Sequence, residues 1–463
     1  MILFSDNAFR IFFFYYRFLM KQLYTILLWV FFVYLCDLSV FSAQAQTVSP
    51  VLLEAPKPLG DIRSLRREKD IETFKPVAER TPSELDAVPV RWRGFVILPN
   101  LVSEQAIDTN IFATSKDQET DTITSLKPSV SIGKNFGRHR ANASIGGELK
   151  KYWSNTGEDI FNFDAKIGGT LEARRELTIP FELTYASGHE GRGQNFSPNF
   201  SEEPIGFKTY GGALGINYNP NRFNLSLVGR YGNIAFDNGS SNAGNIIIRE
   251  DGDRSFTDLE MSASYEILPN HRPFVSLNIG SIDYERGDFQ NGSFSGPERD
   301  SVNLEALTGW QFSYKGLVQG SFGLGYGSRD YDDDSIDDVA STRVASNLSW
   351  NVTKKATLNL GLKRSITEDN QIVQGVLLSQ AKVSLDYEFL HNLYYNTYLD
   401  YALAEFEGSS REDDILSAGA GLRYLINPRY SLSGDYKFKS RDSSAMGLDY
   451  DRHQFMMRFH SRF

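Results

Sequence analysis

The chain has 463 residues, of which 13% are aromatic, and its formal net charge is −10. This length suits one large barrel or two to three soluble domains. An acidic chain without basic clusters is a poor binder of nucleic acid, so we expect no nucleic-acid partner. The mean hydropathy of −0.34 argues against a bundle of membrane-spanning helices.

The first 45 residues have the pattern of a secretory signal peptide. Lys21 precedes an apolar run over residues 23–35, and residues 43–45 form an A-x-A cleavage site. Met20 is the expected start, because Met20-Lys21 opens a signal of ordinary length. An N-terminal membrane anchor is the alternative. The only cysteine, Cys36, lies in this segment, so we expect neither a disulfide nor thiol chemistry in the mature chain.

Residues 46–91 have a different character from the rest of the chain. They are charged, are interrupted by prolines and lack the alternation of a strand. We interpret them as a periplasmic tail with a short helix that begins near Asp61. A flexible linker is the simpler interpretation of this tail. A plug of the barrel, or a docking segment, is the alternative.

Apolar and polar side chains alternate over long segments in the remainder of the chain. Examples are residues 223–231, 302–314, 357–363, 393–403 and 430–439. Successive side chains of a strand face opposite sides, so each segment has one apolar face and one polar face. Strands of soluble sandwiches usually have about five or six residues. These segments have roughly ten residues or more, the length that a tilted strand needs to cross a bilayer.

The chain divides into eighteen predicted strands joined by connections that alternate between short and long. Short turns on one side and long loops on the other are typical of outer-membrane barrels, as is an even number of strands. We therefore predict an all-β fold, a transmembrane antiparallel β-barrel over residues 92–463, in the outer membrane, with the tail in the periplasm. The predicted strands are 94–108, 121–136, 139–153, 159–174, 176–187, 205–219, 222–236, 254–267, 273–285, 299–314, 316–328, 338–353, 356–366, 375–389, 392–406, 412–426, 428–440 and 449–463.

The last strand ends on an aromatic residue that is also the last residue of the chain. Phe455, Met457, Phe459 and Phe463 lie on one face of this strand, and the other face is mostly polar or charged. C-terminal strands of outer-membrane barrels typically end in Phe, and the barrel-assembly machinery binds them. We therefore predict these four residues to be an assembly signal. Ser461 departs from the pattern, because an apolar residue is usual there.

The predicted inward faces carry charges of both signs. An eighteen-stranded barrel is too wide for strand side chains alone to fill, so we expect a channel, or a lumen narrowed by loops or by the tail. The predicted pore-lining residues are Arg230, Arg423, Lys437, Lys439 and Arg458. The last four lie on three neighbouring strands and would favour anionic solutes. Wall residues paired with carboxylates are the alternative.

The sequence lacks a constellation typical of an enzyme, a cofactor site or a metal site. The acidic stretch 330–338 has neither the Gly nor the terminal Glu of an EF-hand loop. We interpret it as a solvated loop that faces lipopolysaccharide. The glycines of residues 323–327 lie in a predicted strand with no helix after it, which excludes a dinucleotide loop. His189 is interpreted as a residue at the rim of the barrel.

One segment resembles a known family. Residues 93–101 (RGFVILPNL), followed by Asp108-Thr109-Asn110-Ile111-Phe112-Ala113-Thr114, are similar to the first strand of a putative outer-membrane β-barrel porin family that is common in alphaproteobacteria. The resemblance covers about residues 92–463 and implies an outer-membrane barrel. Some members of the family are encoded near polysaccharide-export genes. The family has no known catalytic residues to carry over.

Two functions follow from these patterns. The first is a porin-like channel for small hydrophilic solutes or for an exported glycan. The second is a structural or adhesive barrel with a blocked lumen and acidic surface loops. In both cases we expect no enzymatic activity and no cofactor. The expected partners are outer-membrane lipid, lipopolysaccharide and the barrel-assembly machinery.

Overall fold

The computed structural model describes residues 76–80, 85, 87–193, 201–241, 244–290, 292–367 and 375–463. The predicted signal peptide and the helix expected near Asp61 lie outside the described residues. No helix in the described part of the chain is long and apolar enough to cross a membrane.

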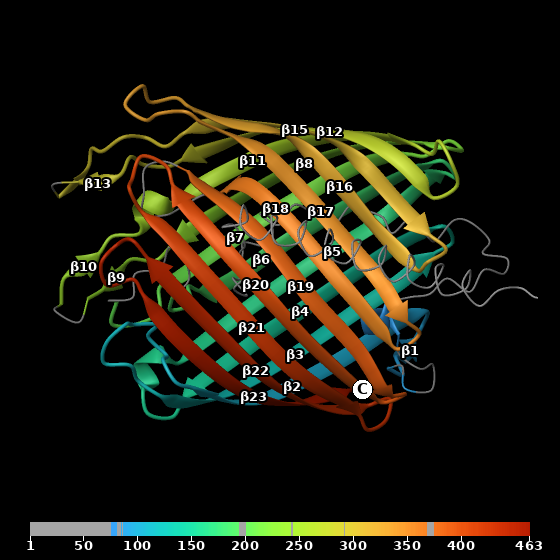
Figure 1. Ribbon diagram of the computed structural model, residues 1–463, viewed down its shortest axis with the longest axis horizontal. Helices are drawn as coiled ribbons and strands as arrows, with labels where there is room; N and C mark the ends of the chain where they lie inside the picture. The colour runs from blue at the N-terminus through green and yellow to red at the C-terminus, as the bar shows by residue number, and fades with distance from the viewer. Residues whose placement is uncertain are drawn as a thin grey trace, which may run out of the picture.

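Eighteen long strands of the described residues form one closed antiparallel barrel (Figure 1). Each strand pairs with the next along the chain, and the first, β2, pairs with the last, β23. This confirms the predicted fold class and strand number, and the predicted strand ends agree within three residues. The strands are β2 (Phe95–Asp108), β3 (Asp121–Phe136), β4 (His139–Tyr152), β5 (Ile160–Arg174), β6 (Leu177–His189), β7 (Gly206–Tyr218), β8 (Phe223–Phe236), β11 (Arg254–Tyr265), β12 (His271–Tyr284), β15 (Ser301–Tyr314), β16 (Val318–Tyr331), β17 (Val339–Thr353), β18 (Ala356–Thr367), β19 (Val376–Leu390), β20 (Leu393–Phe406), β21 (Glu412–Leu425), β22 (Tyr430–Ser443) and β23 (Tyr450–Arg462).

The outer face of the barrel is apolar. Leu183, Leu214 and Val275 are 59%, 61% and 57% exposed, and each lies at an outward position of its strand. Apolar side chains exposed in so continuous a band would favour aggregation in water, but they match the hydrocarbon core of a bilayer. The alternation in the sequence therefore separates a lipid-facing surface from a polar lumen.

The two ends of the barrel differ in their connections. At one end the strands are joined by tight turns, such as Gly137-Arg138, where Gly137 has a φ of 63° that favours glycine. At the other end lie the longer loops, which contain the short hairpins β9 (Gly239–Ser240) with β10 (Ile246–Ile247) and β13 (Phe289–Gln290) with β14 (Ser293–Phe294). Figure 1 shows β9, β10 and β13 at the end opposite to the C-terminus. We label the tight-turn end periplasmic and the long-loop end extracellular, which is the orientation that the connection lengths predict.

Three 3₁₀ turns and one extra strand complete the described structure. The turns are η2 (Val77–Glu79), η4 (Thr156–Glu158) and η5 (Glu250–Gly252), and the strand is β1 (Val90–Trp92). β1 pairs with the start of β2 through the two-residue turn Arg93-Gly94, whose φ angles of 48° and 82° are those of a tight hairpin. Strand structure thus begins at Val90, two residues before the predicted barrel boundary.

A buried carboxylate fastens the seam between the first and last strands. Asp108 ends β2 and is fully buried. Arg452 of β23 forms a salt bridge with it through two of its guanidinium nitrogens, and Gln454 Nε2 donates to Asp108 Oδ2 at 2.7 Å. The backbone N–H of Asn110 donates to the other oxygen at 3.1 Å. Asp108 therefore connects β2, β23 and the loop that follows β2.

We predict that Asp108→Asn weakens the folded barrel by about 3 kcal/mol, because removing one partner of a buried ion pair leaves the other charge uncompensated. Urea unfolding of the refolded protein in detergent, followed by the heat-modifiable band shift, measures this loss. Asp164→Asn is the matched control, because Asp164 is an exposed side chain of β5. Equal stability of the two variants would contradict the proposed role of Asp108.

Candidate functional site

The lumen wall is the candidate site, and its charged side chains come from the inward positions of the strands. Arg230 of β8 is 7% exposed and lies between two carboxylates of β11. Its Nη1 is 2.6 Å from Asp258, and its Nη2 is 2.6 Å from Glu260. The register places Arg230 directly opposite Asp258, so the pairing follows from the strand alignment. One predicted pore-lining cation is thus neutralised on its own wall.

Arg458 of β23 is also paired. Its guanidinium forms salt bridges with Glu104 of β2 and Asp435 of β22. Glu104 also accepts from Lys127 at 3.4 Å, and Lys127 lies 3.1 Å from Glu148 of β4. The wall from β22 to β4 therefore carries a row of alternating charges that crosses the seam. Such a row stiffens the wall and contributes little net field.

The other three predicted pore-lining cations form no salt bridge with a carboxylate among the described residues. Arg423 of β21 lies over the ring of Tyr394, with its Cζ 5.2 Å from the centroid. Lys439 of β22 donates to the Gly193 carbonyl at 3.3 Å. Lys437 forms no hydrogen bond or ion pair within the described part of the chain. These three cations lie on the inward faces of two adjacent strands.

A further cation faces the lumen beside this strip. Lys382 of β19 has its Nζ 5.1 Å from the ring centroid of Tyr398 and forms no ion pair with another described residue. Lys382 was not among the predicted pore-lining residues, although it follows the same period-two alternation. The register places it directly opposite Asp400, in the same row as Lys439 with two strands between them.

The extracellular mouth is narrowed by the loop after β6. Arg192 in this loop is 7% exposed and pairs with Glu158 of η4, whose Oε2 accepts from Nε at 3.0 Å. The Gly193 carbonyl accepts from the Tyr450 hydroxyl at 2.8 Å and from Lys439. These bonds hold the loop against the inner wall of β22 and β23.

The motif that carried the family resemblance lies at the same mouth. Asn110 is fully buried, and its Nδ2 donates to the carbonyls of Thr114 at 2.8 Å and Asp451 at 2.9 Å. Ile111 is 1% exposed and packs with Ala106 and other buried residues. The motif therefore holds the loop after β2 in place through buried hydrogen bonds and apolar packing. The sequence did not reveal this structural role.

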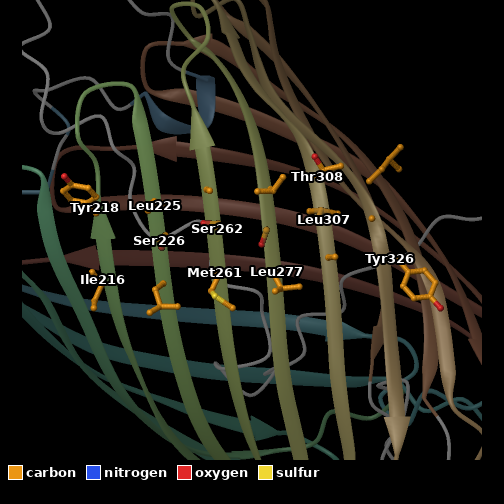
Figure 2. A pocket seen from close by; sticks show the side chains of 17 residues that line it. Ile216, Tyr218, Leu225, Ser226, Met261, Ser262, Leu277, Leu307, Thr308 and Tyr326 are labelled. Atoms are coloured by element: carbon orange, nitrogen blue, oxygen red, sulfur yellow. The ribbon is translucent and has the colours of Figure 1, made fainter.

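A groove of about 900 Å³ lies elsewhere, on the outer surface of β7, β8, β11, β12, β15 and β16 (Figure 2). Leu225, Met261 and Tyr326 line it and are exposed at outward positions. They alternate with inward residues such as Arg230 and Glu260, so the groove faces lipid and does not open into the lumen.

The described residues contain no group of three or more His, Cys, Asp or Glu side chains that is arranged to hold a metal ion. His189 has its Nδ1 2.9 Å from Asn162 Oδ1, at the extracellular end of β6. In the loop after β16 the half-buried Asp333 accepts hydrogen bonds from Ser335, and the other carboxylates are exposed. These contacts agree with the interpretation of His189 as a rim residue and of the acidic stretch as a surface loop.

Comparison with known proteins assigns the family. The model of the Putative beta-barrel porin 2 family matches residues 82–463. The chain belongs to this family. It is thus an outer-membrane β-barrel of the porin type, a class whose members are typically channels without enzymatic activity. The match does not bear on polysaccharide export or on an alphaproteobacterial origin, which stay predictions.

No curated protein matches the chain. Among solved structures, OccK2 (OpdF) of Pseudomonas aeruginosa aligns with 10% identity and a TM-score of 0.44, covering 79% of this chain and 98% of its own. OpdK of the same organism, with vanillate, aligns with 13% identity and a TM-score of 0.43, over 79% and 99%. The copper transporter OprC aligns with 11% identity and a TM-score of 0.46, over 81% and 84%. We draw no conclusion about this porin from matches of this strength.

One carboxyl of the extracellular loops is set to titrate near neutral pH. Asp253 lies between η5 and β11, outside the membrane-spanning strands, and its Oδ1 accepts from the Phe236 N–H at 2.7 Å. Burial is the largest cause that raises the pKa of Asp253, and Glu285 and Glu250 also raise it. The hydrogen bond from the Phe236 N–H and the charge of Arg286 lower it, and the pKa that results is about 6. Because this pKa is above that of an unfolded Asp, about 3.9, the protonated loop is the more stable one.

We predict that the stabilising effect of this proton is complete below about pH 4 and is lost as the pH rises through about 6. Hydrogen exchange of the amides in residues 250–254, corrected for intrinsic rates, should show less protection at pH 7.5 than at pH 5. Asp253→Asn keeps the acceptor for Phe236 and should make protection independent of pH. Protection that stays pH-dependent in this variant would rule out Asp253 as the titrating group.

Proposed function

We propose that this protein is a passive channel of the outer membrane that favours small anionic hydrophilic solutes. The observation that carries the proposal is the strip of Arg423, Lys437 and Lys439, which face the lumen and form no salt bridge with a described carboxylate. Charge in a narrow channel with low-dielectric walls focuses potential, so unpaired cations enrich anions. The paired cations Arg230 and Arg458 add little to this field. The proposal includes no catalytic step and no cofactor.

A structural or adhesive barrel is the second candidate. The extracellular loop that is bonded to Tyr450 and Lys439 favours it, because this loop narrows the mouth. Single-channel recording in planar bilayers separates the candidates. Discrete conductance steps are expected for a channel, and a correctly folded barrel without conductance would favour the structural candidate.

For the channel, we predict that Lys437→Glu/Lys439→Glu moves ion selectivity towards cations. Lumen substitutions change selectivity without changing lipid packing, so the barrel should stay folded. Reversal potentials across a salt gradient measure the change. Lys116→Glu/Lys354→Glu has the same change in net charge at exposed positions outside the strands and should have a much smaller effect. Unchanged reversal potentials in the first variant would mean that Lys437 and Lys439 do not set the field of the pore.

We also propose that the outward residues of β23 are the signal bound by the barrel-assembly machinery. Phe455, Met457, Phe459 and Phe463 are 52%, 60%, 42% and 47% exposed. The backbone N–H of Phe463 donates to the Pro99 carbonyl of β2 at 3.0 Å, so the chain end reaches the seam. These aromatic side chains beside the seam are exposed on the outer face, where a partner could contact them.

Deletion of Phe463 should lower the yield of folded barrel in the outer membrane several-fold and leave unfolded chain in the periplasm. Fractionation and the heat-modifiable band shift measure both species. Phe136→Ala removes an aromatic side chain of similar exposure, 51%, at the periplasmic end of β3, and should leave the yield nearly unchanged. A deletion variant that assembles as well as Phe136→Ala would exclude the assembly role.

A further inference from the structure

Part of the segment that precedes the barrel lies inside its periplasmic mouth. Val77 of η2 is 1% exposed and packs against Tyr394 of β20 and Leu425 of β21, with Leu85 at the edge of the cluster. Tyr394 shares its face with Asn396, Tyr398 and the other inward residues of β20, and Leu425 shares its face with Arg423. Val77 therefore contacts the lumen wall, close to the tight-turn end of both strands.

Polar contacts fix the backbone of the same segment. The Val77 N–H donates to Thr357 Oγ1 at 2.9 Å, and the Thr357 hydroxyl donates to Asn351 Oδ1 at 2.7 Å. Asn351 Nδ2 in turn donates to the Gly316 carbonyl at 2.7 Å. Thr357 is fully buried and Asn351 is 1% exposed, so this chain of hydrogen bonds is shielded from water. The Arg80 guanidinium donates to the Lys354 carbonyl in the turn between β17 and β18.

The contacts therefore form a receptor for one short segment. The receptor has an apolar surface, formed by Tyr394 and Leu425, and a hydroxyl acceptor, Thr357. It therefore fits a residue that has an apolar side chain and a backbone N–H that can donate. Val77 satisfies both, whereas its neighbour Ala78 is exposed. Among the described residues, the buried Pro76 and Val77 and a few hydrogen bonds hold the segment, so its attachment is weaker than that of a barrel strand.

We propose that the segment Pro76–Arg80 is a detachable stopper of the periplasmic mouth, seated in the receptor of Thr357, Tyr394 and Leu425. While it is seated it narrows the lumen, and its release widens the path. The claim that the segment limits ion flow rests on the proposed channel function. The claims that the segment binds the receptor and limits access to the lumen do not depend on that function.

Seating is tested by cross-linking in intact outer membranes. The only cysteine of the chain, Cys36, precedes the expected cleavage site, so introduced cysteines have no native competitor. Val77→Cys/Leu425→Cys should be joined by a short bifunctional thiol reagent. Val88→Cys/Leu425→Cys is the control, because Val88 is 57% exposed and lies outside the cluster. A first pair that cross-links no better than the control would overturn the proposal.

Access is tested by Val77→Asp, which places a carboxylate in the buried cluster and should release the segment without touching the barrel wall. Ala78→Asp is the matched control, since it adds the same charge one residue away at an exposed position. Asn396→Cys supplies a lumen thiol just beyond the receptor, and its reaction with a bulky maleimide should be several-fold faster in the Val77→Asp background only. An equal rate in both backgrounds would overturn the stopper role.

Conductance gives the third measurement. Val77→Asp should conduct more than the parent and Ala78→Asp, and cross-linked Val77→Cys/Leu425→Cys should conduct less than its uncross-linked form. Equal conductance of all these channels would overturn the stopper role. If none of the barrels conducts, the channel function fails, and the cross-linking and labelling results still decide whether the segment is seated and limits access.

Discussion

The structure depends on the closure of one sheet. In the hydrocarbon core of a membrane no water is present to bond a free sheet edge, so every backbone N–H and C=O must find its partner within the protein. β2 and β23 provide the last partners, in register from Asn100 with Arg462 to Asp108 with Gln454. Residues at both ends of this seam are held by further bonds, the buried Asp108 on one side and the Phe463 backbone on the other. The other long strands pair with strands that are their neighbours along the chain, whereas this seam joins the first long strand to the last.

Closure of the sheet also decides which side chains the inner wall can contain. The outward positions must be apolar, but the inward positions are free to be polar because they face water or one another. Arg230 lies opposite Asp258 in the register and pairs with it. Lys437 lies opposite Gly419, which has no side chain that could pair with it. Strand register therefore decides which partners lie within reach of each cation. Register alone does not ensure a pair, because Lys382 lies opposite Asp400 and forms no salt bridge with another described residue.

Much of this fold could be predicted from the sequence, because a period of two and alternating connection lengths are local signals. They identified the eighteen strands and the faces that carry Phe455 or Lys437. The pairing of Arg458 with Glu104 could not be predicted, because it joins strands at opposite ends of the chain and depends on their register. The hydrogen bond between Val77 and Thr357 could not be predicted either, because the two residues are 280 positions apart and the sequence around Val77 has no periodic pattern. The fastening role of Asp108 was also missed, because its partners lie on the last strand.

Segments of the chain itself lie in both mouths of the barrel, but they are held in different ways. At the extracellular mouth the loop that contains Arg192 is fixed by a buried ion pair and by two bonds to the Gly193 carbonyl. Releasing it would leave Glu158 as an uncompensated buried charge, which is costly. At the periplasmic mouth the described segment that contains Val77 leaves behind an apolar surface, the Thr357 hydroxyl and the Lys354 carbonyl, none of which carries a net charge. If either mouth changes its width, the periplasmic one therefore has the lower barrier to opening.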